Sequence, residues 1–188
     1  PFTAQQLATV ECVGPVDLLH ELQAAGFKGK IDADGWQLKL DALALIPVLT
    51  GVPPRIVTGE GYDYDPLVKK VVKNVGEKMV QVAMAAIAAL EVLAIGLGPA
   101  VFSKHSKPSA KVLLRRNKEK KCVVPVLSCL DAMYSTGCLN LKAVMDSIKD
   151  TVHPPKATDK KVPHSQCAAL EFVDRCLRSK AVAWDGPA

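Results

Sequence analysis

Histidine, serine and acidic side chains carry most enzyme chemistry, and in this chain their spacing forms no catalytic pattern. The four histidines show neither an HExxH motif nor the Cys/His spacing of a metal site: His20, His105, His153 and His164. In SKHSK, two serines flank His105, but no acid lies nearby in sequence, so we interpret this stretch as a solvated loop. The sequence therefore predicts no catalytic residue, no bound metal and no cofactor.

Two other stretches contain residue types that serve active sites elsewhere. IGLGPA holds Gly96 and Gly98, but it follows a helical rather than a strand pattern, which predicts a helix end and not a phosphate-binding loop. In GYDYDP, Asp63 and Asp65 are expected to cap a helix that has Pro66 at its first position, rather than to act as an acid and a base.

The six cysteines do not have the spacing of a disulfide framework. Cys122 and Cys129 lie seven residues apart on a helical pattern, Cys167 and Cys176 lie on another, and the chain has no CxxC motif. We interpret them as buried cytosolic thiols rather than as bridges or zinc ligands.

A lysine-rich tetrapeptide, KEKK at residues 118–121, stands directly before the apolar run CVVPVL. A solvated loop is one interpretation. A nuclear-localisation or nucleic-acid patch is less favoured, because only three of the four charges are positive and no aromatic residues interleave with them. Its meaning depends on the elements around it.

The length and composition of the chain indicate a single domain of ordinary size. The chain has 188 residues, of which 49% are apolar, 23% charged and 5% aromatic, and its net charge is +5. This composition is that of a soluble globular protein, and the mild basicity suits an acidic protein partner at least as well as nucleic acid. MVQVAMAAIAALEVLAIGLG is the most apolar stretch, but Gln81 and Glu91 make it too amphipathic to cross a membrane.

Apolar residues recur at helical spacing in four long segments, and no window of similar length alternates with period two. We expect these residues on the buried stripes: Met79, Val82, Ala83, Ala86, Leu90, Leu93, Ala94 and Leu97; Val123, Val126, Leu127, Leu130, Met133 and Tyr134; Cys167, Leu170, Val173 and Leu177; and Leu40, Leu43 and Ile46. The sequence predicts an all-α fold.

The long helices recur at a fixed interval. With starts near Trp36, Glu77, Lys120 and Lys161, the intervals are 41, 43 and 41 residues. Shorter helices precede them at residues 16–25, 66–72, 110–116 and 139–148. A helix pair every 40 to 47 residues is typical of HEAT or armadillo repeats, which stack into a solenoid. We expect one domain over residues 1–188, with repeats at about 15–50, 63–98, 104–136 and 138–178.

Two irregular features interrupt this pattern. Residues 50–65 hold three glycines and two prolines and are expected to form a loop insertion. Pro47 lies inside the first long helix, where we expect a kink or an early end.

In such a solenoid, the turn inside each pair lies on one shared edge, which gives the basic tetrapeptide a context. The four turns are DADGW (32–36), KNVGE (73–77), NKEKK (117–121) and DKKVP (159–163). Trp36 opens its helix, and the stripe through Leu40, Leu43 and Ile46 does not require it. Burial in the core is the alternative. An exposed indole beside a row of lysines has the composition of a protein-binding hot spot.

Several motifs resemble one family in order and spacing. WQLKLDALALI is similar to the start of TOG domains, the tubulin-binding units of the microtubule-polymerase family, with PVDLLHEL as the lead-in helix. AAIAALEVLAIGLGPAVF followed by LLRRNKEKKCVV resembles the family's approach to its third loop, and KKVP its fourth. The resemblance covers about residues 15–178 and implies a flat paddle of HEAT-like helix pairs with the intra-repeat loops on one edge.

The resemblance also implies a set of tubulin-binding residues. Trp36 matches the family's loop tryptophan and Lys39 the basic residue after it. Lys118, Lys120 and Lys121 belong to the third loop, and Lys161 matches the fourth-loop lysine. Gly76 marks the second loop, where Val75-Gly76-Glu77 replaces the family's Asp-Ser/Thr-Asn turn. Gln166 stands where a basic residue is common, and the family's fifth-repeat loop is missing or diverged.

The function that the resemblance implies is a non-enzymatic module of a microtubule-associated protein. It would bind αβ-tubulin heterodimers or microtubule ends, without nucleic acid or membrane, in the cytoplasm and cytoskeleton, at spindle or microtubule-organising centre. The first residues, PFTAQQ, lack an initiator Met, so we expect a piece of a larger multidomain protein that is monomeric in isolation. The alternatives are a HEAT scaffold without tubulin affinity and, less favoured, a nucleic-acid-binding solenoid.

Overall fold

The computed structural model describes residues 14–154 and 162–182, and helices dominate both ranges. The helices are α2 (Leu18–Ala24), α3 (Phe27–Ile31), α4 (Trp36–Thr50), α5 (Asp65–Val75), α6 (Val80–Arg116), a 3-10 turn η1 (Lys120–Cys122), α7 (Val123–Ser135), α8 (Leu141–Val152) and α9 (Pro163–Val182). The predicted all-α fold is confirmed. Within the described ranges, the extended pairing recorded is a single bridge between Val16 and Ile56.

Helix α6 is two helices joined at a sharp bend. Gly98 has φ 64° and ψ −177°, outside the helical region, and Pro99 follows it. Proline is well suited to open a helix, because its missing N–H is not needed there. The predicted end at IGLGPA is therefore confirmed, whereas the helix expected at residues 110–116 begins much earlier, at Pro99.

The length and mean hydropathy of α6 would be sufficient to cross a membrane. Half of its most apolar window is buried against other helices, however, and the bend at Gly98 divides it. Both features are those of a core helix in a helical solenoid.

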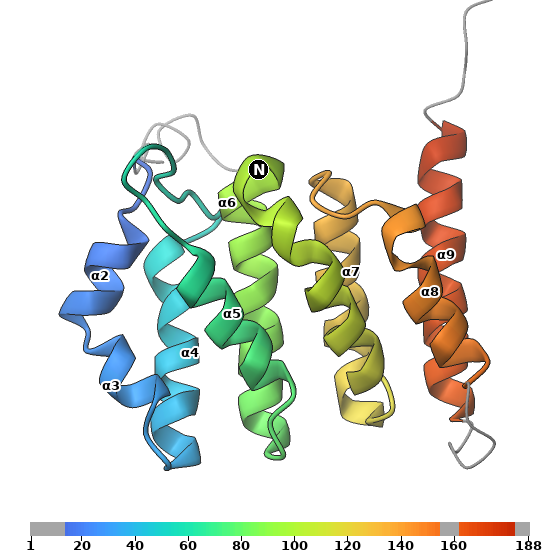
Figure 1. Cartoon of the computed structure of the whole chain (residues 1–188), viewed down its shortest axis with the longest axis horizontal. Helices are drawn as coiled ribbons and strands as arrows, with labels where there is room; N and C mark the ends of the chain where they lie inside the picture. Colours follow the sequence, from blue (N-terminus) through green and yellow to red (C-terminus); the bar gives the residue numbers. More distant parts are fainter. Residues whose placement is uncertain (1–13, 155–161, 183–188) are drawn as a thin grey trace, which may run out of the picture.

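The helices form pairs that stand side by side in one row (Figure 1). The pairs are α3 with α4, α5 with the first half of α6, the second half of α6 with α7, and α8 with α9. The second members start at Trp36, Val80, Val123 and Pro163, so the predicted period of about 40 residues holds. This is the architecture of a HEAT-like solenoid.

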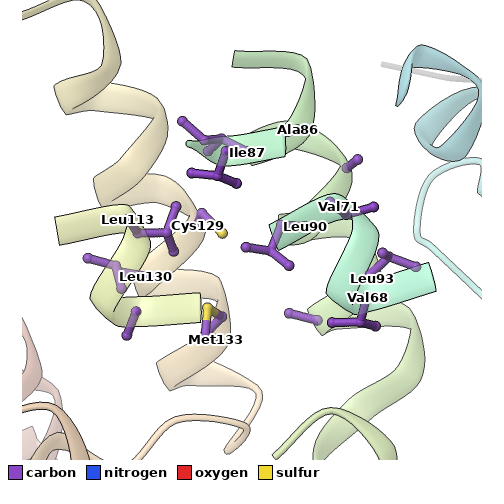
Figure 2. Close-up of a cluster of buried hydrophobic side chains, with 14 of the residues drawn as sticks. Val68, Val71, Ala86, Ile87, Leu90, Leu93, Leu113, Cys129, Leu130 and Met133 are labelled. Atoms are coloured by element: carbon purple, nitrogen blue, oxygen red, sulfur yellow. The ribbon is translucent and has the colours of Figure 1, made fainter. Parts of the chain in front are cut away.

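The core runs between the two layers of helices along the row. Figure 2 shows its centre, where side chains of α5, both halves of α6 and α7 meet: Val68, Val71, Ala86, Ile87, Leu90, Leu93, Leu113, Cys129, Leu130 and Met133. Each of these side chains is fully buried. Burial stabilises the fold by about 2 kcal/mol for each large aliphatic side chain. The alanines of α6 leave room for the neighbouring helices to approach closely.

Four residues expected on buried stripes are exposed instead: Met79, Cys167, Leu170 and Leu177. Met79 precedes the first turn of α6, and Leu170 and Leu177 lie on an outer face of α9, where more than half of each leucine side chain is open to solvent. On α9 the prediction was wrong because this helix is the last of the row in the described chain (Figure 1). Its buried face is formed by Ala168, Ala169, Phe172 and Cys176.

Two expectations about helix termini need correction. Helix α4 does not end early at Pro47, one of the two alternatives expected there, but continues to Thr50, whose hydroxyl donates to the carbonyl of Ile46 at 2.9 Å. Asp65 does not cap α5 but is its first residue, with Tyr64 at the cap position. Its carboxylate instead accepts hydrogen bonds from Lys104 at 2.5 Å and from His105 at 3.0 Å, which ties the start of α5 to the second half of α6.

The predicted loop insertion, residues 51–64 between α4 and α5, is anchored at two points. Val16 and the loop exchange hydrogen bonds of 2.9 Å, one from Val16 N–H to Arg55 and one from Val57 N–H to Val16. Ile56 packs so closely on α6 that a Cβ on Gly96 would lie 2.6 Å from it. Close approach of the loop therefore explains this glycine.

Within the described ranges, Cys122, Cys129, Cys138 and Cys167 are free thiols. Cys122, Cys129, Cys138 and Cys176 are buried and Cys167 is exposed. Burial raises the pKa of the Cys129 thiol well above its usual range. The prediction of buried thiols is confirmed for these four and wrong for Cys167; Cys12 lies outside the described residues.

Candidate protein-binding edge

Three of the four predicted turns lie along one edge of the row, at the bottom in Figure 1. They are residues 32–35 before α4, 76–79 before α6, and 117–122 before α7. We call this edge, with the first turn of the helix that follows each turn, the loop edge. Most of the fourth turn, including Lys161, lies outside the described residues.

Trp36 is the first residue of α4, and 39% of its surface is exposed. Gly35 precedes it in an extended conformation and provides no side-chain cap. The buried stripe of α4 is formed by Ala42, Leu43 and Ile46, further along the helix. The indole therefore lies on the loop edge and not in the core.

Lys39 connects the first turn to the second. Its ammonium group donates to Glu77 at 2.9 Å, and both side chains are partly buried. This hydrogen bond is the main cause of the lowered pKa of Glu77. The charge of Lys39 is thus matched within the loop edge, which fits a role in holding two turns together.

The second turn is tight and has ordinary dihedral angles. The N–H of Gly76 donates to Lys73 at 3.1 Å, and that of Glu77 donates to Asn74 at 3.2 Å. Gly76 is exposed and its φ is −82°, so its backbone does not require glycine. Met79 follows, with 38% of its surface exposed.

The basic tetrapeptide forms the third turn. Glu119 pairs with Arg116 at 2.9 Å, and Cys122 is buried beneath the turn. The three lysines, Lys118, Lys120 and Lys121, are exposed and form no ion pair within the part of the chain that the structure describes. The single acid of the tetrapeptide, Glu119, is therefore paired with the last residue of α6, and three positive charges face solvent.

The first turn of α9 contacts the third turn. The Nε2 atom of His164 lies 3.0 Å from the carbonyl oxygen of Lys118. The contact joins residues 46 apart in sequence and positions the start of α9 beside the basic turn. Gln166, at the position where a basic residue is common in the family, donates to the carbonyl of Val152 at 2.6 Å.

Sequence reasoning missed three residues of the loop edge. Glu77 and His164 gave no local signal, because each acts on a partner about 40 residues away. Met79 was assigned to a buried stripe, since its spacing fits the helix that follows. Its position just before the first turn of α6 could have indicated exposure, because a residue that precedes a helix is less covered by neighbouring helices than one within it.

Residues that could do other chemistry are not gathered at this edge. Within residues 14–154 and 162–182, no group of three or more His, Cys, Asp or Glu side chains could hold a metal ion. His105 is buried against Asp65, while His20 is exposed on α2. The loop edge offers an indole, a thioether and lysines, which are groups for binding a protein surface.

Known proteins resemble the chain over almost its full length. It is 32% identical over 177 residues to Protein MOR1 of Arabidopsis thaliana and 28% identical over 175 residues to Protein mini spindles of Drosophila melanogaster. A chain from a solved structure on microtubule plus-end tracking by XMAP215, CLIP-170 and EB1 has 26% identity and a TM-score of 0.72, over 87% of this chain and 64% of that one. The chain belongs to the TOG domains of the microtubule-polymerase family. No family model matches it.

The match to MOR1 of Arabidopsis thaliana includes 93% of this TOG domain but only 8% of the length of MOR1. The relationship therefore concerns one domain-sized part of a much longer relative.

Proposed function

We propose that this TOG domain binds αβ-tubulin through its loop edge, as a non-enzymatic module of a microtubule-associated protein that regulates microtubule growth. The observation that carries the proposal is the alignment of Trp36, the Lys39–Glu77 bridge and the lysines of the third turn on one edge. The family relationship supports it, since the relatives include mini spindles and the solved structure concerns plus-end tracking.

In the proposed contact, an apolar side chain and charged side chains contribute differently to binding. The indole of Trp36 supplies apolar area that is desolvated on binding, and such anchors contribute roughly 2 kcal/mol or more. Lys118, Lys120 and Lys121 face an acidic surface and steer association, and their contribution to affinity is smaller and salt-dependent. Lys39 and Gly76 belong to the first and second turns, and Lys161, outside the described residues, is proposed as part of the same contact.

The remaining parts of the proposal concern the protein as a whole. We place it in the cytoplasm and cytoskeleton, at microtubules, the spindle or a microtubule-organising centre. The domain acts as a monomer in isolation, is not an enzyme, and uses no cofactor, metal, nucleic acid or membrane. It is one domain of a longer multidomain protein, as MOR1 is far longer than the matched part.

Co-elution with purified αβ-tubulin on a sizing column, at low and at physiological salt, tests the proposal. Wild type is expected to form a complex, and Trp36→Ala is expected to lose at least tenfold in affinity. Val48→Ala is the matched control, because Val48 is an exposed apolar residue of the same helix away from the loop edge. Circular dichroism checks that each variant is folded.

Two results would contradict the proposal. Absence of a complex at both salt concentrations would leave a HEAT scaffold that serves another partner. Equal binding by folded Trp36→Ala and wild type would remove the indole from the interface. Single changes Lys118→Ala and Lys120→Ala are expected to weaken the complex less, and chiefly at low salt.

A further inference from the structure

A row of positive charges runs along the second half of α6, on the layer of helices that carries α5 and α8 (Figure 1). Lys107, Lys111 and Arg115 follow one another at intervals of four residues, and Lys118 continues the row at the third turn. Residues three or four apart lie on the same face of a helix. All four side chains are exposed. We call this row the α6 basic stripe.

The charges of the stripe are not compensated within the domain. Lys104, one turn before the stripe, and Arg116, beside Arg115, pair with Asp65 and Glu119. In the two described ranges, by contrast, the stripe residues form no ion pair. Like charges at this spacing repel one another, so the row is unfavourable for the isolated helix. An acidic binding partner would remove that repulsion.

A small hollow adjoins the stripe between α6 and α8. Its volume is about 170 Å³, which suits one side chain, and its wall includes Lys111, Arg115 and Lys118. Ser147, Thr151 and Ser165 add hydroxyl groups, and Asp150 is the carboxylate among the described lining residues. Three cations against one anion leave the wall positively charged.

One of these hydroxyl groups has no hydrogen-bond partner among the described residues. Ser165 is 2% exposed, and its Oγ atom forms no hydrogen bond with any residue that the structure describes. Thr151, by comparison, donates to the carbonyl of Ser147 at 2.8 Å. A buried hydroxyl without a partner is unfavourable, and a bound acceptor would satisfy it. The hollow thus has a positively charged wall and borders a buried hydroxyl that lacks a partner among the described residues, which suits a carboxylate.

We propose that the α6 basic stripe and its hollow form a second docking site, for an acidic peptide segment of a protein partner. One carboxylate of the segment enters the hollow beside Ser165, and further carboxylates follow the stripe towards Lys107. Extended nucleic acid fits less well, because the described lining carries no aromatic side chain for base stacking and Asp150 opposes a phosphate backbone. Of the stripe, only Lys118 also belongs to the loop edge.

Fluorescence polarisation with a labelled oligoglutamate peptide tests this site. The double change Lys111→Ala/Arg115→Ala is expected to weaken binding about tenfold or more. Lys142→Ala/Lys149→Ala, on α8, removes the same charge from exposed positions outside the stripe and is expected to change affinity less than about twofold. Ser165→Ala is expected to weaken binding severalfold without lowering the melting temperature, since its hydroxyl has no partner to lose.

The outcomes separate this site from the loop edge. Folded Trp36→Ala is expected to bind the peptide as wild type does, and Lys111→Ala/Arg115→Ala is expected to co-elute with tubulin as wild type does. Equal losses in the stripe and control variants would overturn the proposal in favour of diffuse charge. Tighter binding of an oligodeoxythymidine of equal charge, with the same dependence on the stripe, would overturn it in favour of nucleic acid.

Discussion

At the scale of single residues, this TOG domain is joined by polar contacts between side chains that are distant in sequence. Asp65, at the start of α5, accepts hydrogen bonds from Lys104 and His105 on the second half of α6. The bond from Lys104 is the main cause of the lowered pKa of Asp65, and that from His105 adds to it. The contact holds two successive helix pairs in register and therefore affects the spacing of their turns.

The lowered pKa of Asp65 predicts a dependence of stability on pH. Because its pKa is lower in the folded chain than the ordinary 3.8, the ionised carboxylate stabilises the fold above that value. This contribution is lost as the pH falls through the lower, folded-state pKa. We expect Asp65→Asn to lower the melting temperature at neutral pH and to reduce the loss of stability below about pH 4. Thermal denaturation of both proteins across that range measures it.

His164→Ala does not alter this carboxylate and serves as a control for the loss of a polar contact elsewhere. It is expected to lower the melting temperature, but not to reduce the fall in melting temperature that occurs below about pH 4. If the melting temperatures of wild type and Asp65→Asn fell equally below about pH 4, Asp65 would not be the cause of the loss of stability in acid.

At the scale of elements, the bend in α6 determines where one helix pair ends and the next begins. Gly98 has a φ of 64°, which L-residues with a Cβ adopt only at a cost. We expect Gly98→Ala to lower the free energy of unfolding by roughly 1–2 kcal/mol. Gly29→Ala is the matched control, because α3 holds Gly29 in open space at an ordinary φ. It is expected to be neutral or slightly stabilising, and chemical denaturation compares the two.

Helix α7 provides a second test at this scale. Leu130 is fully buried among side chains of α6 and α7, whereas Val124 on the same helix is 76% exposed. Leu130→Ala is expected to cost about 2–5 kcal/mol, through lost burial and a residual cavity. Val124→Ala is expected to stay within about 0.5 kcal/mol of wild type. Similar losses in both variants would contradict the placement of the core between the two layers.

The helix pairs could be predicted from sequence because their signals are local. Apolar spacing indicated the long helices, and Gly98-Pro99 marked the bend in α6. Residues at ends were less predictable: Met79 and Leu177 fit a helical stripe but lack a neighbouring helix to cover them. Of the loop edge, sequence predicted exposed Trp36 and the lysines, but not the Lys39–Glu77 bridge, since such pairs depend on how repeats stack.

At the scale of the whole molecule, the repeat period places chemically different turns on one edge. The first turn presents Trp36 and the third presents Lys118, Lys120 and Lys121, with a bridged second turn between them. Because the helix pairs pack through one continuous core, these groups keep fixed positions relative to one another.

The separation of the indole from the lysines predicts that changes at the two places respond differently to salt in their effect on tubulin affinity. Mobile ions screen exposed charges beyond about 10 Å at 0.1 M, so the lysines should matter most at low salt. Lys118→Ala/Lys120→Ala is expected to bind tubulin more weakly than wild type at low salt and to converge with it as salt rises. Trp36→Ala is expected to remain weaker at every concentration, because burial of an indole does not depend on screening. Dissociation constants measured over a salt series test both; parallel curves for the lysine variant and wild type would place the lysines outside the interface.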